Sequence, residues 1–360
     1  MADHHFREAA TKKFYTNANV SLGVKLTSFL NFKTSYAYRG THYRYTQHYP
    51  DFTSNAQSPN LYPYSYEGTY YWEEQVIDNI LNFNKDFGKH SVTAMVGSSI
   101  TTTKYTDNGV GVEGKTSKYY VDANGNLASK DEAAGFLDPS FSTIDSGAGG
   151  TFSGDGTKYK YNRASFFGRV NYSFAGKYLL QATMRYDGSS KFGPDSRWGT
   201  FPSASVAWRL NEESFIKNLN IFSNLKFRIG WGKTGSSYGD GSKSIAQIST
   251  SKMYYYWWNG VNYTEQMGAA KDKEIDTNLH WETNEQTNLG IDMGFMDNAL
   301  NVTLDYFIRN SYDLLLDRNM RPSTGFTSIY TNAGKTQNKG FEFAVNYRKT
   351  FGDWFVNVGV

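Results

Sequence analysis

Hydrophobic and polar residues alternate with period two along most of the chain. In one segment the apolar positions are Tyr178, Leu180, Ala182, Met184 and Tyr186, while Gln181, Thr183, Arg185 and Asp187 lie between them. Side chains that alternate in this way project to opposite faces of a β-strand. The pattern therefore predicts an all-β chain whose strands have one apolar and one polar face.

Twelve segments carry this pattern. They are residues 14–25, 30–45, 69–84, 91–105, 161–174, 178–188, 198–210, 225–235, 283–295, 299–315, 337–350 and 354–360. Strands of globular proteins usually have about 5–6 residues, whereas a tilted strand needs about 9–11 to cross a bilayer. Most of the predicted strands reach that length.

The connections alternate between short and long. Short turns with Gly, Asn or Asp are expected at residues 86–89, 175–177, 297–299 and 351–353, and long loops at residues 47–67, 106–160, 236–282 and 318–336. Residues 211–224 are intermediate and predict one helical turn on the short side. Short connections at one end and long ones at the other are typical of outer-membrane barrels. The sequence thus predicts part of an antiparallel transmembrane β-barrel, with short periplasmic turns and long extracellular loops.

The predicted barrel assigns an environment to each side chain. By parity Ala182 faces lipid, and Thr183 faces the interior together with Arg169, Arg185, Asp187 and Arg228. These charged side chains either line a wet interior or pair with one another or with a plug. A soluble sandwich of two sheets, such as an adhesin or a glycan-binding surface protein, has the same alternation and is the alternative.

Composition agrees with the barrel. Aromatic residues make up 17% of the chain, with 28 Tyr, 25 Phe and 8 Trp, and membrane barrels place such residues in girdles at both interfaces. There is no cysteine, which excludes disulfides and thiolate metal sites. A net charge of +3 without a basic cluster argues against a nucleic-acid partner.

Three chemical motifs have simpler interpretations. Residues 109–116, GVGVEGKT, match a phosphate-binding loop, but a strand-like segment follows where a helix is required. Asp122, Asn124 and Asn126 resemble half of a calcium loop, although an Asn-Gly turn explains them. The six histidines are spread over the tail, loops and a turn without metal-ligand spacing, so surface positions are expected; they are His4, His5, His42, His48, His90 and His280. No catalytic residue, metal site or cofactor is predicted, and the chain is not expected to be an enzyme.

One loop carries a candidate binding site. The expected long loop 236–282 contains a dense run of aromatic residues, which are Tyr254, Tyr255, Tyr256, Trp257 and Trp258. Aromatic faces stack on sugar rings, so the run is a candidate substrate contact; packing between loops is the other interpretation.

Five stretches together resemble the SusC/RagA family of TonB-dependent transporters. They are residues 82–90 (NFNKDFGKH), 191–209 (KFGPDSRWGTFPSASVAWR), 224–235 (NLKFRIGWGKTG), 276–290 (DTNLHWETNEQTNLG) and 338–342 (NKGFE). The resemblance covers most of residues 71–360. It implies a barrel of about twenty-two strands that encloses a plug.

The resemblance also implies function and partners. The family imports oligosaccharides or peptides across the outer membrane, driven by the TonB complex, and a SusD-like surface lipoprotein forms a lid. The chain resembles the middle of that barrel, so the expectation is that residues 1–360 are a partial barrel domain without the plug, the signal peptide and the closing C-terminal strands.

Overall fold

The computed structural model describes residues 8–49, 63–123, 127–133, 144, 150–237, 248–258, 263–271 and 273–360. The chain divides into two compact units. One comprises residues 1–20, 36–76 and 101–160, and the other comprises residues 21–35, 77–100 and 161–360. Among the described residues, no helix is long and apolar enough to cross a membrane.

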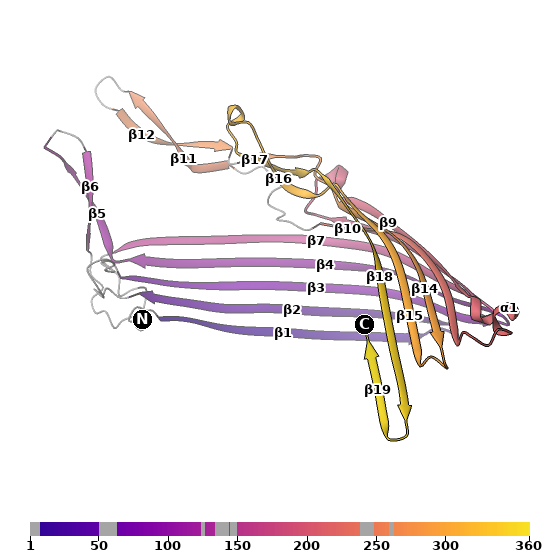
Figure 1. Ribbon diagram of the computed structural model, residues 1–360. Helices are drawn as coiled ribbons and strands as arrows, with labels where there is room; N and C mark the ends of the chain where they lie inside the picture. Colours follow the sequence, from indigo (N-terminus) through magenta and orange to yellow (C-terminus); the bar gives the residue numbers. More distant parts are fainter. Residues whose placement is uncertain are drawn as a thin grey trace. The chain divides into compact units, whose positions relative to one another are not determined.

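Twelve strands form one sheet, and they lie side by side in the order in which they occur along the chain (Figure 1). In order they are β1 Glu8–Lys25, β2 Leu30–Tyr49, β3 Tyr64–Phe87, β4 His90–Glu113, β7 Thr151–Phe174, β8 Tyr178–Ser189, β9 Trp198–Arg209, β10 Asn224–Ser236, β14 Glu282–Phe295, β15 Leu300–Tyr312, β18 Lys335–Phe351 and β19 Trp354–Gly359. From β7 to β19 every pairing is antiparallel. The twelve predicted strands are confirmed.

Several strands are longer than predicted. β3, β4 and β7 each have 24 residues, so the expected loops 47–67 and 106–160 begin too early or end too late. Residues 106–113 and 151–160 are rich in Gly, Thr and Asp and lack apolar contrast, yet sheet pairing needs only backbone donors and acceptors. β15 instead ends earlier than expected, where Asp313 adopts a positive φ of 56°.

The long connections contain seven further strands among the described residues, and the sequence indicated only the first of them, as the strand-like segment after residues 109–116. They are β5 Lys115–Val121, β6 Leu127–Ala133, β11 Ile248–Trp258, β12 Tyr263–Lys271, β13 Glu274–Ile275, β16 Leu315–Asn319 and β17 Ser328–Asn332. β5 pairs with β6, β11 with β12, and β17 with both β13 and β16. The prediction that residues 236–282 and 318–336 are loops throughout is therefore wrong.

In the first unit, rows of aromatic rings run across neighbouring strands. Tyr43 stacks on Tyr70 with 4.3 Å between ring centroids, Tyr70 meets Tyr105 edge to face, and Tyr105 stacks on Tyr159 at 4.6 Å. Such cross-strand pairs stabilise a sheet through side-chain contact. They fix the register here, where the polar sequence gives little periodic contrast.

In the second unit, the sheet has the two faces that the alternation predicts. We call the side that carries Leu180, Met184 and Val206 the apolar face, and the side that carries Gln181 and Arg228 the polar face. The apolar side chains are not covered: Met184 is 54% exposed and Val206 is 48% exposed. The sheet therefore needs an apolar environment on this side.

The short turns of the second unit are hydrogen-bonded to a neighbouring turn or strand. The Ala175 amide donates to the Lys89 carbonyl at 2.6 Å, and the Arg348 amide donates to the Ala299 carbonyl at 2.7 Å. Gly176 has a φ of 69°, a left-handed conformation that glycine adopts without steric cost. These bonds place the short connections at one end of the sheet.

The connection between β9 and β10, residues 210–223, is the longest at this end. It contains the 3-10 helix η4, Leu210–Glu212, and the predicted single helical turn α1, Ser214–Lys217. Glu213 precedes α1, and its carboxylate accepts hydrogen bonds from the Tyr178 hydroxyl at 2.9 Å, the Lys177 ammonium at 3.1 Å and the Trp208 indole at 3.2 Å. These donors lower the pKa of Glu213.

We expect this arrangement to make stability depend on pH below neutrality. Because the folded pKa of Glu213 is depressed, its stabilising contribution is complete above the unfolded value of about 4.3 and is lost as the pH falls through the lower folded value. Glu213→Gln should therefore be less stable than the wild type at pH 6, and the difference should shrink as the pH approaches 3. Thermal unfolding in detergent micelles measures this; a difference that does not change with pH would contradict it.

Candidate functional site

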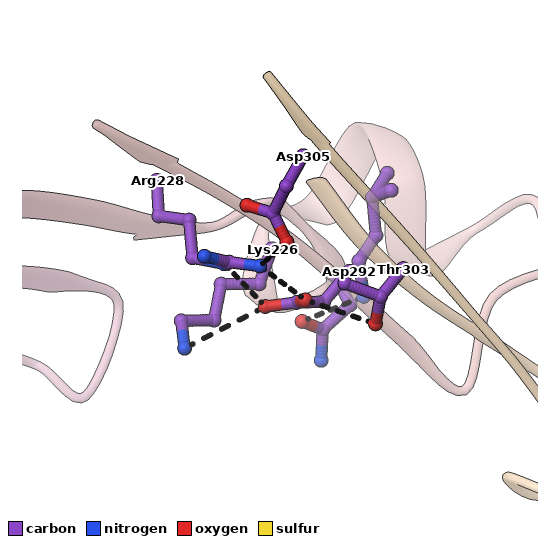
Figure 2. A network of polar contacts seen from close by, with 7 residues as sticks. Lys226, Arg228, Asp292, Thr303 and Asp305 are labelled. Carbon is purple, nitrogen blue, oxygen red and sulfur yellow. Dashed lines mark hydrogen bonds and ion pairs between the residues drawn. The ribbon is translucent and has the colours of Figure 1, made fainter. Parts of the chain in front are cut away.

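A network of charged side chains spans three strands on the polar face (Figure 2). Arg228 of β10 donates through Nε to Asp292 of β14 at 3.1 Å and through Nη2 to Asp305 of β15 at 2.7 Å. A second bond from Nη2 to Asp292, at 3.3 Å, makes that pair bidentate. Lys226 lies 3.8 Å from Asp292, and the Thr303 hydroxyl donates to the same carboxylate at 3.3 Å.

The strand register creates this network. Arg228 lies opposite Gly290, and Gly290 lies opposite Asp305, so the guanidinium crosses a position without a side chain to reach the third strand. A Cβ at Gly290 would lie 2.5 Å from Asp305 Oδ1 and 2.6 Å from Arg228 Cζ. The absence of a side chain at Gly290 is thus a requirement of the network.

The network is balanced in charge. Lys226 and Arg228 carry two positive charges, and Asp292 and Asp305 carry two negative ones. Their side chains are 19–33% exposed, so they lie against the sheet and still reach solvent. This arrangement holds neighbouring strands in register and presents a polar surface that water wets.

The other predicted interior charges have different fates. Arg185 is paired: Nε lies 2.7 Å from Asp187, and Nη2 donates to the Ser165 hydroxyl at 3.0 Å. Arg169 is exposed. Pairing within the predicted set is therefore found for Arg185 with Asp187, whereas Arg228 pairs with carboxylates outside that set and Arg169 is open to solvent.

A groove of about 350 Å³ lies on the polar face, with uncharged side chains around it. Its lining includes Thr93 of β4, Asn171 of β7, Gln181 of β8 and Ser205 of β9. The Asn171 amide donates to the Thr93 hydroxyl at 3.0 Å across the β4–β7 pair. The groove offers neutral hydrogen-bonding groups of the kind that contact water, a sugar or a peptide backbone.

At the long-loop end, a buried apolar cluster joins three connections. Phe192, Phe201, Leu279 and Trp281 are its core, and Leu315 and Tyr330 pack against it. The Trp281 indole donates to the Arg197 carbonyl at 3.0 Å, which ties the 277–281 segment to the β8–β9 connection with its 3-10 helix η3, Pro194–Ser196. We call these residues the rim cluster. Sequence reasoning did not identify it.

We expect Gly235→Ala to disrupt the rim cluster. A Cβ at Gly235 would lie 1.9 Å from Cζ of Phe201, a side chain that is only 6% exposed. Overpacking of this kind typically costs about 1–3 kcal/mol. Chemical unfolding should show the loss, and Phe201→Leu in the same chain should recover part of it; a neutral Gly235→Ala would contradict the packing.

The candidate aromatic run lies in a strand, which corrects the expectation of an irregular loop. Residues Tyr254 to Trp258 belong to β11, whose backbone register pairs Tyr254 with Met267 and Trp258 with Tyr263 of β12. None of these aromatic residues belongs to the charged network, which lies on β10, β14 and β15. The role of the run in binding substrate remains a prediction.

The remaining motifs are placed as follows. Strand β5 follows residues 109–114, so the helix that a phosphate-binding loop requires is not formed. Asn124 and Asn126 of the calcium-like stretch lie outside the described residues, as do His4 and His5. Among the described residues, no group of three potential ligands could hold a metal ion.

The histidines are not all surface residues. His48 is only 6% exposed and its Nδ1 lies 2.7 Å from the Ser65 hydroxyl, so the surface interpretation is wrong for this residue. His42 stacks on Tyr71 at 4.1 Å. His90 Nδ1 lies 2.7 Å from the Tyr172 hydroxyl, and His280 lies 3.6 Å from Asp313. Each is used in packing or hydrogen bonding between strands or loops.

The structure places four of the five stretches that carry the family resemblance. Residues 191–209 and 276–290 meet in the rim cluster, since the first contains Phe192 and Phe201 and the second contains Leu279 and Trp281. Residues 224–235 and 276–290 also form the paired strands on which Arg228 and Gly290 lie. In residues 338–342, Glu342 lies opposite Asp305.

Comparison with known proteins agrees with this geometry. A family profile described as TonB dependent receptor-like, beta-barrel, matches residues 3–360. The chain is 38% identical over 184 residues to the TonB-dependent receptor SusC of Bacteroides thetaiotaomicron, which covers 51% of this chain and 18% of that protein. It is 29% identical over 325 residues to the TonB-dependent receptor P39 of Formosa agariphila, covering 90% of this chain and 28% of that protein.

The fold matches solved transporters. The structure of the RagAB peptide transporter aligns with a TM-score of 0.82 at 21% identity, over 99% of this chain and 36% of that one. The chain thus spans between about a fifth and a third of the length of its curated relatives. With a profile match over nearly every residue and the two-faced sheet that it implies, the chain belongs to the TonB-dependent receptor-like β-barrel family.

Proposed function

We propose that the chain forms part of the wall of an outer-membrane transporter that imports oligosaccharides or peptides with energy from TonB. The observation that carries the proposal is the two-faced sheet, whose exposed apolar face and charged polar face suit lipid on one side and a wet interior on the other. In the full-length protein further strands close the barrel around a plug. The matches to SusC and P39 cover only 18% and 28% of those proteins, which supports the presence of further strands and a plug in a full-length protein.

The aromatic residues of the apolar face support a membrane location. Tyr178 stacks on Trp208 near the turn end of the sheet, and Tyr186 stacks on Trp198 near the other end. Along β8 the two tyrosines are about 26 Å apart at ~3.3 Å per residue. Outer-membrane barrels have an apolar band about 25 Å tall between aromatic girdles. Because barrel strands tilt by about 35–45°, the two pairs are separated by roughly 19–22 Å along the membrane normal, so they fall near the two edges of such a band.

The polar face supports a lining role. Arg228, Asp292 and Asp305 keep their charges satisfied within the wall, and the groove beside Gln181 offers neutral donors and acceptors. A plug, water or a passing substrate finds hydrogen-bonding partners on this surface. These groups suit the binding and orientation of such a molecule. No nucleophile among them lies beside a general base.

The substrate class and the partners are proposed from the family resemblance. SusC and RagA-type receptors suggest an oligosaccharide or a peptide, a SusD-like surface lipoprotein as the outer lid, and the TonB complex in the periplasm. The aromatic run from Tyr254 to Trp258 is our candidate for a substrate contact, because β11 belongs to a long connection between wall strands. The alternative of a soluble sandwich is not favoured, since large side chains of the apolar face, such as Met184 and Val206, stay exposed in the described part of the chain.

The test uses cells that produce the full-length protein and cells from which its gene is deleted. We expect uptake of either fluorescent oligosaccharides or fluorescent oligopeptides to be lost on deletion and on depletion of TonB. The protein should stay in the membrane after carbonate washing. Release by carbonate would contradict the membrane location, and unchanged uptake of both substrate classes would contradict import.

A further inference from the structure

The β9–β10 connection, residues 210–223, exposes large apolar side chains at the turn end of the sheet. Phe215 is 59% exposed, Leu219 is 52% exposed and Ile221 is 55% exposed. The other short connections are tight turns, so this one is not needed merely to reverse the chain. An exposed apolar group of this kind indicates a surface that contacts lipid or another protein.

Both ends of the connection are fixed to residues of the apolar face. At the start, Glu213 accepts hydrogen bonds from Tyr178 and Trp208. At the end, Phe222 packs on Phe295 with 5.2 Å between ring centroids, and the Ser223 amide donates to the Gly294 carbonyl at 2.8 Å. The connection is thereby held beside the apolar face and not across the polar one.

The charges near the connection are neutralised locally. Lys217 lies 3.4 Å from Glu212, and Lys177 lies 3.1 Å from Glu213. The polar residues Asn218 and Asn220 are exposed between the apolar ones. The connection thus places exposed apolar side chains beside exposed polar ones, and this amphipathic combination suits a segment that lies in the membrane interface.

We propose that the β9–β10 connection is an interfacial anchor, which rests in the headgroup region of the leaflet on the turn side and inserts Phe215, Leu219 and Ile221 towards the acyl chains. The inference depends on the proposed membrane location of the sheet. Lipid is the favoured occupant because the connection continues the apolar face directly, through the girdle residues Tyr178 and Trp208. The paired charges indicate no preference for anionic lipid.

Spin labels in the full-length protein test the proposal. Residues 1–360 contain no cysteine, so a single introduced cysteine can be labelled specifically once any cysteine elsewhere in the full-length protein is replaced. Phe215→Cys and Leu219→Cys probe the anchor, Asn218→Cys is the matched polar control, and Leu180→Cys reports on the apolar face. Each is labelled with a nitroxide in nanodiscs of phosphatidylethanolamine and phosphatidylglycerol. Collision with oxygen is compared with collision with a water-soluble nickel complex.

We expect the labels at Phe215 and Leu219 to collide more often with oxygen than with the nickel complex, as the label at Leu180 does. The label at Asn218 should collide more often with the nickel complex. The contrary result is that the labels at Phe215 and Leu219 collide mainly with the nickel complex, or with neither reagent, while the label at Leu180 collides mainly with oxygen. That result would contradict the interfacial anchor and leave the proposed membrane location intact. A Leu180 label in water instead overturns the proposed membrane location itself. Folding of each variant is verified by the faster gel migration of the unheated protein, and Ile221→Cys replaces either position that fails to fold.

Discussion

Ala182→Arg is expected to destabilise the barrel by roughly 2–4 kcal/mol, the cost of arginine at a lipid-facing midplane position. Ala182 lies on the apolar face, midway along β8 between Tyr178 and Tyr186. Its cross-strand neighbours are Val170 and Ala204, which offer no partner for a guanidinium. Unfolding of the full-length protein by guanidinium chloride in lipid vesicles measures the loss.

The control is the next residue on the same strand. Gln181 lines the polar groove, so Gln181→Arg places the same charge on the polar face with room and water around it. We expect a change within about 0.5 kcal/mol, as for other surface substitutions. Thr183 is a poorer control, because its hydroxyl is buried without a hydrogen-bond partner.

A second substitution at Ala182 separates a lipid-facing wall from a packed core. In lipid, Ala182→Leu meets fluid acyl chains and should be neutral or slightly stabilising. In a sandwich core it would overpack the interior and cost about 1–3 kcal/mol. If Ala182→Leu were as harmful as Ala182→Arg, the apolar face would not face lipid.

Arg228→Met is expected to destabilise the wall by roughly 1.5–3 kcal/mol, the usual range for hydrogen bonds to charged groups. The substitution leaves Asp292 and Asp305 close together on the polar face without the guanidinium that bridges them. Glu342, opposite Asp305 in the register, adds a further negative charge nearby. The same unfolding experiment measures the effect.

The double variant Arg228→Met, Asp305→Asn tests the coupling. Groups in one hydrogen-bond network typically show interaction energies of about 0.5–3 kcal/mol, so the double variant should be less harmful than the sum of the single ones. Lys226→Met is the control, because its 3.8 Å contact with Asp292 is a long ion pair worth about 0.2–1 kcal/mol. Strict additivity of Arg228→Met and Asp305→Asn would mean that the network stores no joint energy.

The sequence predicted the strands well because an apolar and a polar environment impose opposite demands on alternate residues. Where both act, as in residues 178–189, the period-two contrast is strong and the strand bounds are right within a residue or two. The turn at Ala175 and Gly176 was equally visible, since positive φ angles select small or flexible residues. The signal fades in residues 106–113 and 151–160, where both faces are polar.

The contacts between distant residues were not predictable from local pattern. Parity placed Arg228 correctly on the polar face, but its partners Asp292 and Asp305 depend on the register of three strands, and a slip of one residue would reverse every face. Phe192 and Trp281 are about ninety positions apart, and neither lies in an alternating segment. The only signal was the presence of large apolar residues in otherwise polar connections.

The unequal connections at the two ends have a consequence for how such a barrel can diverge. The entropic cost of closing a loop grows only with the logarithm of its length, about 0.6 kcal/mol for each doubling. Residues 237–281 connect β10 to β14, which are direct neighbours in the sheet, so insertions there leave the pairing of Ser236 with Glu282 unchanged. At the opposite end, bonds such as that between Ala175 and Lys89 link one turn to the next. New recognition surfaces can therefore evolve on the long-loop end at little thermodynamic expense, while the turn end tolerates few changes in length.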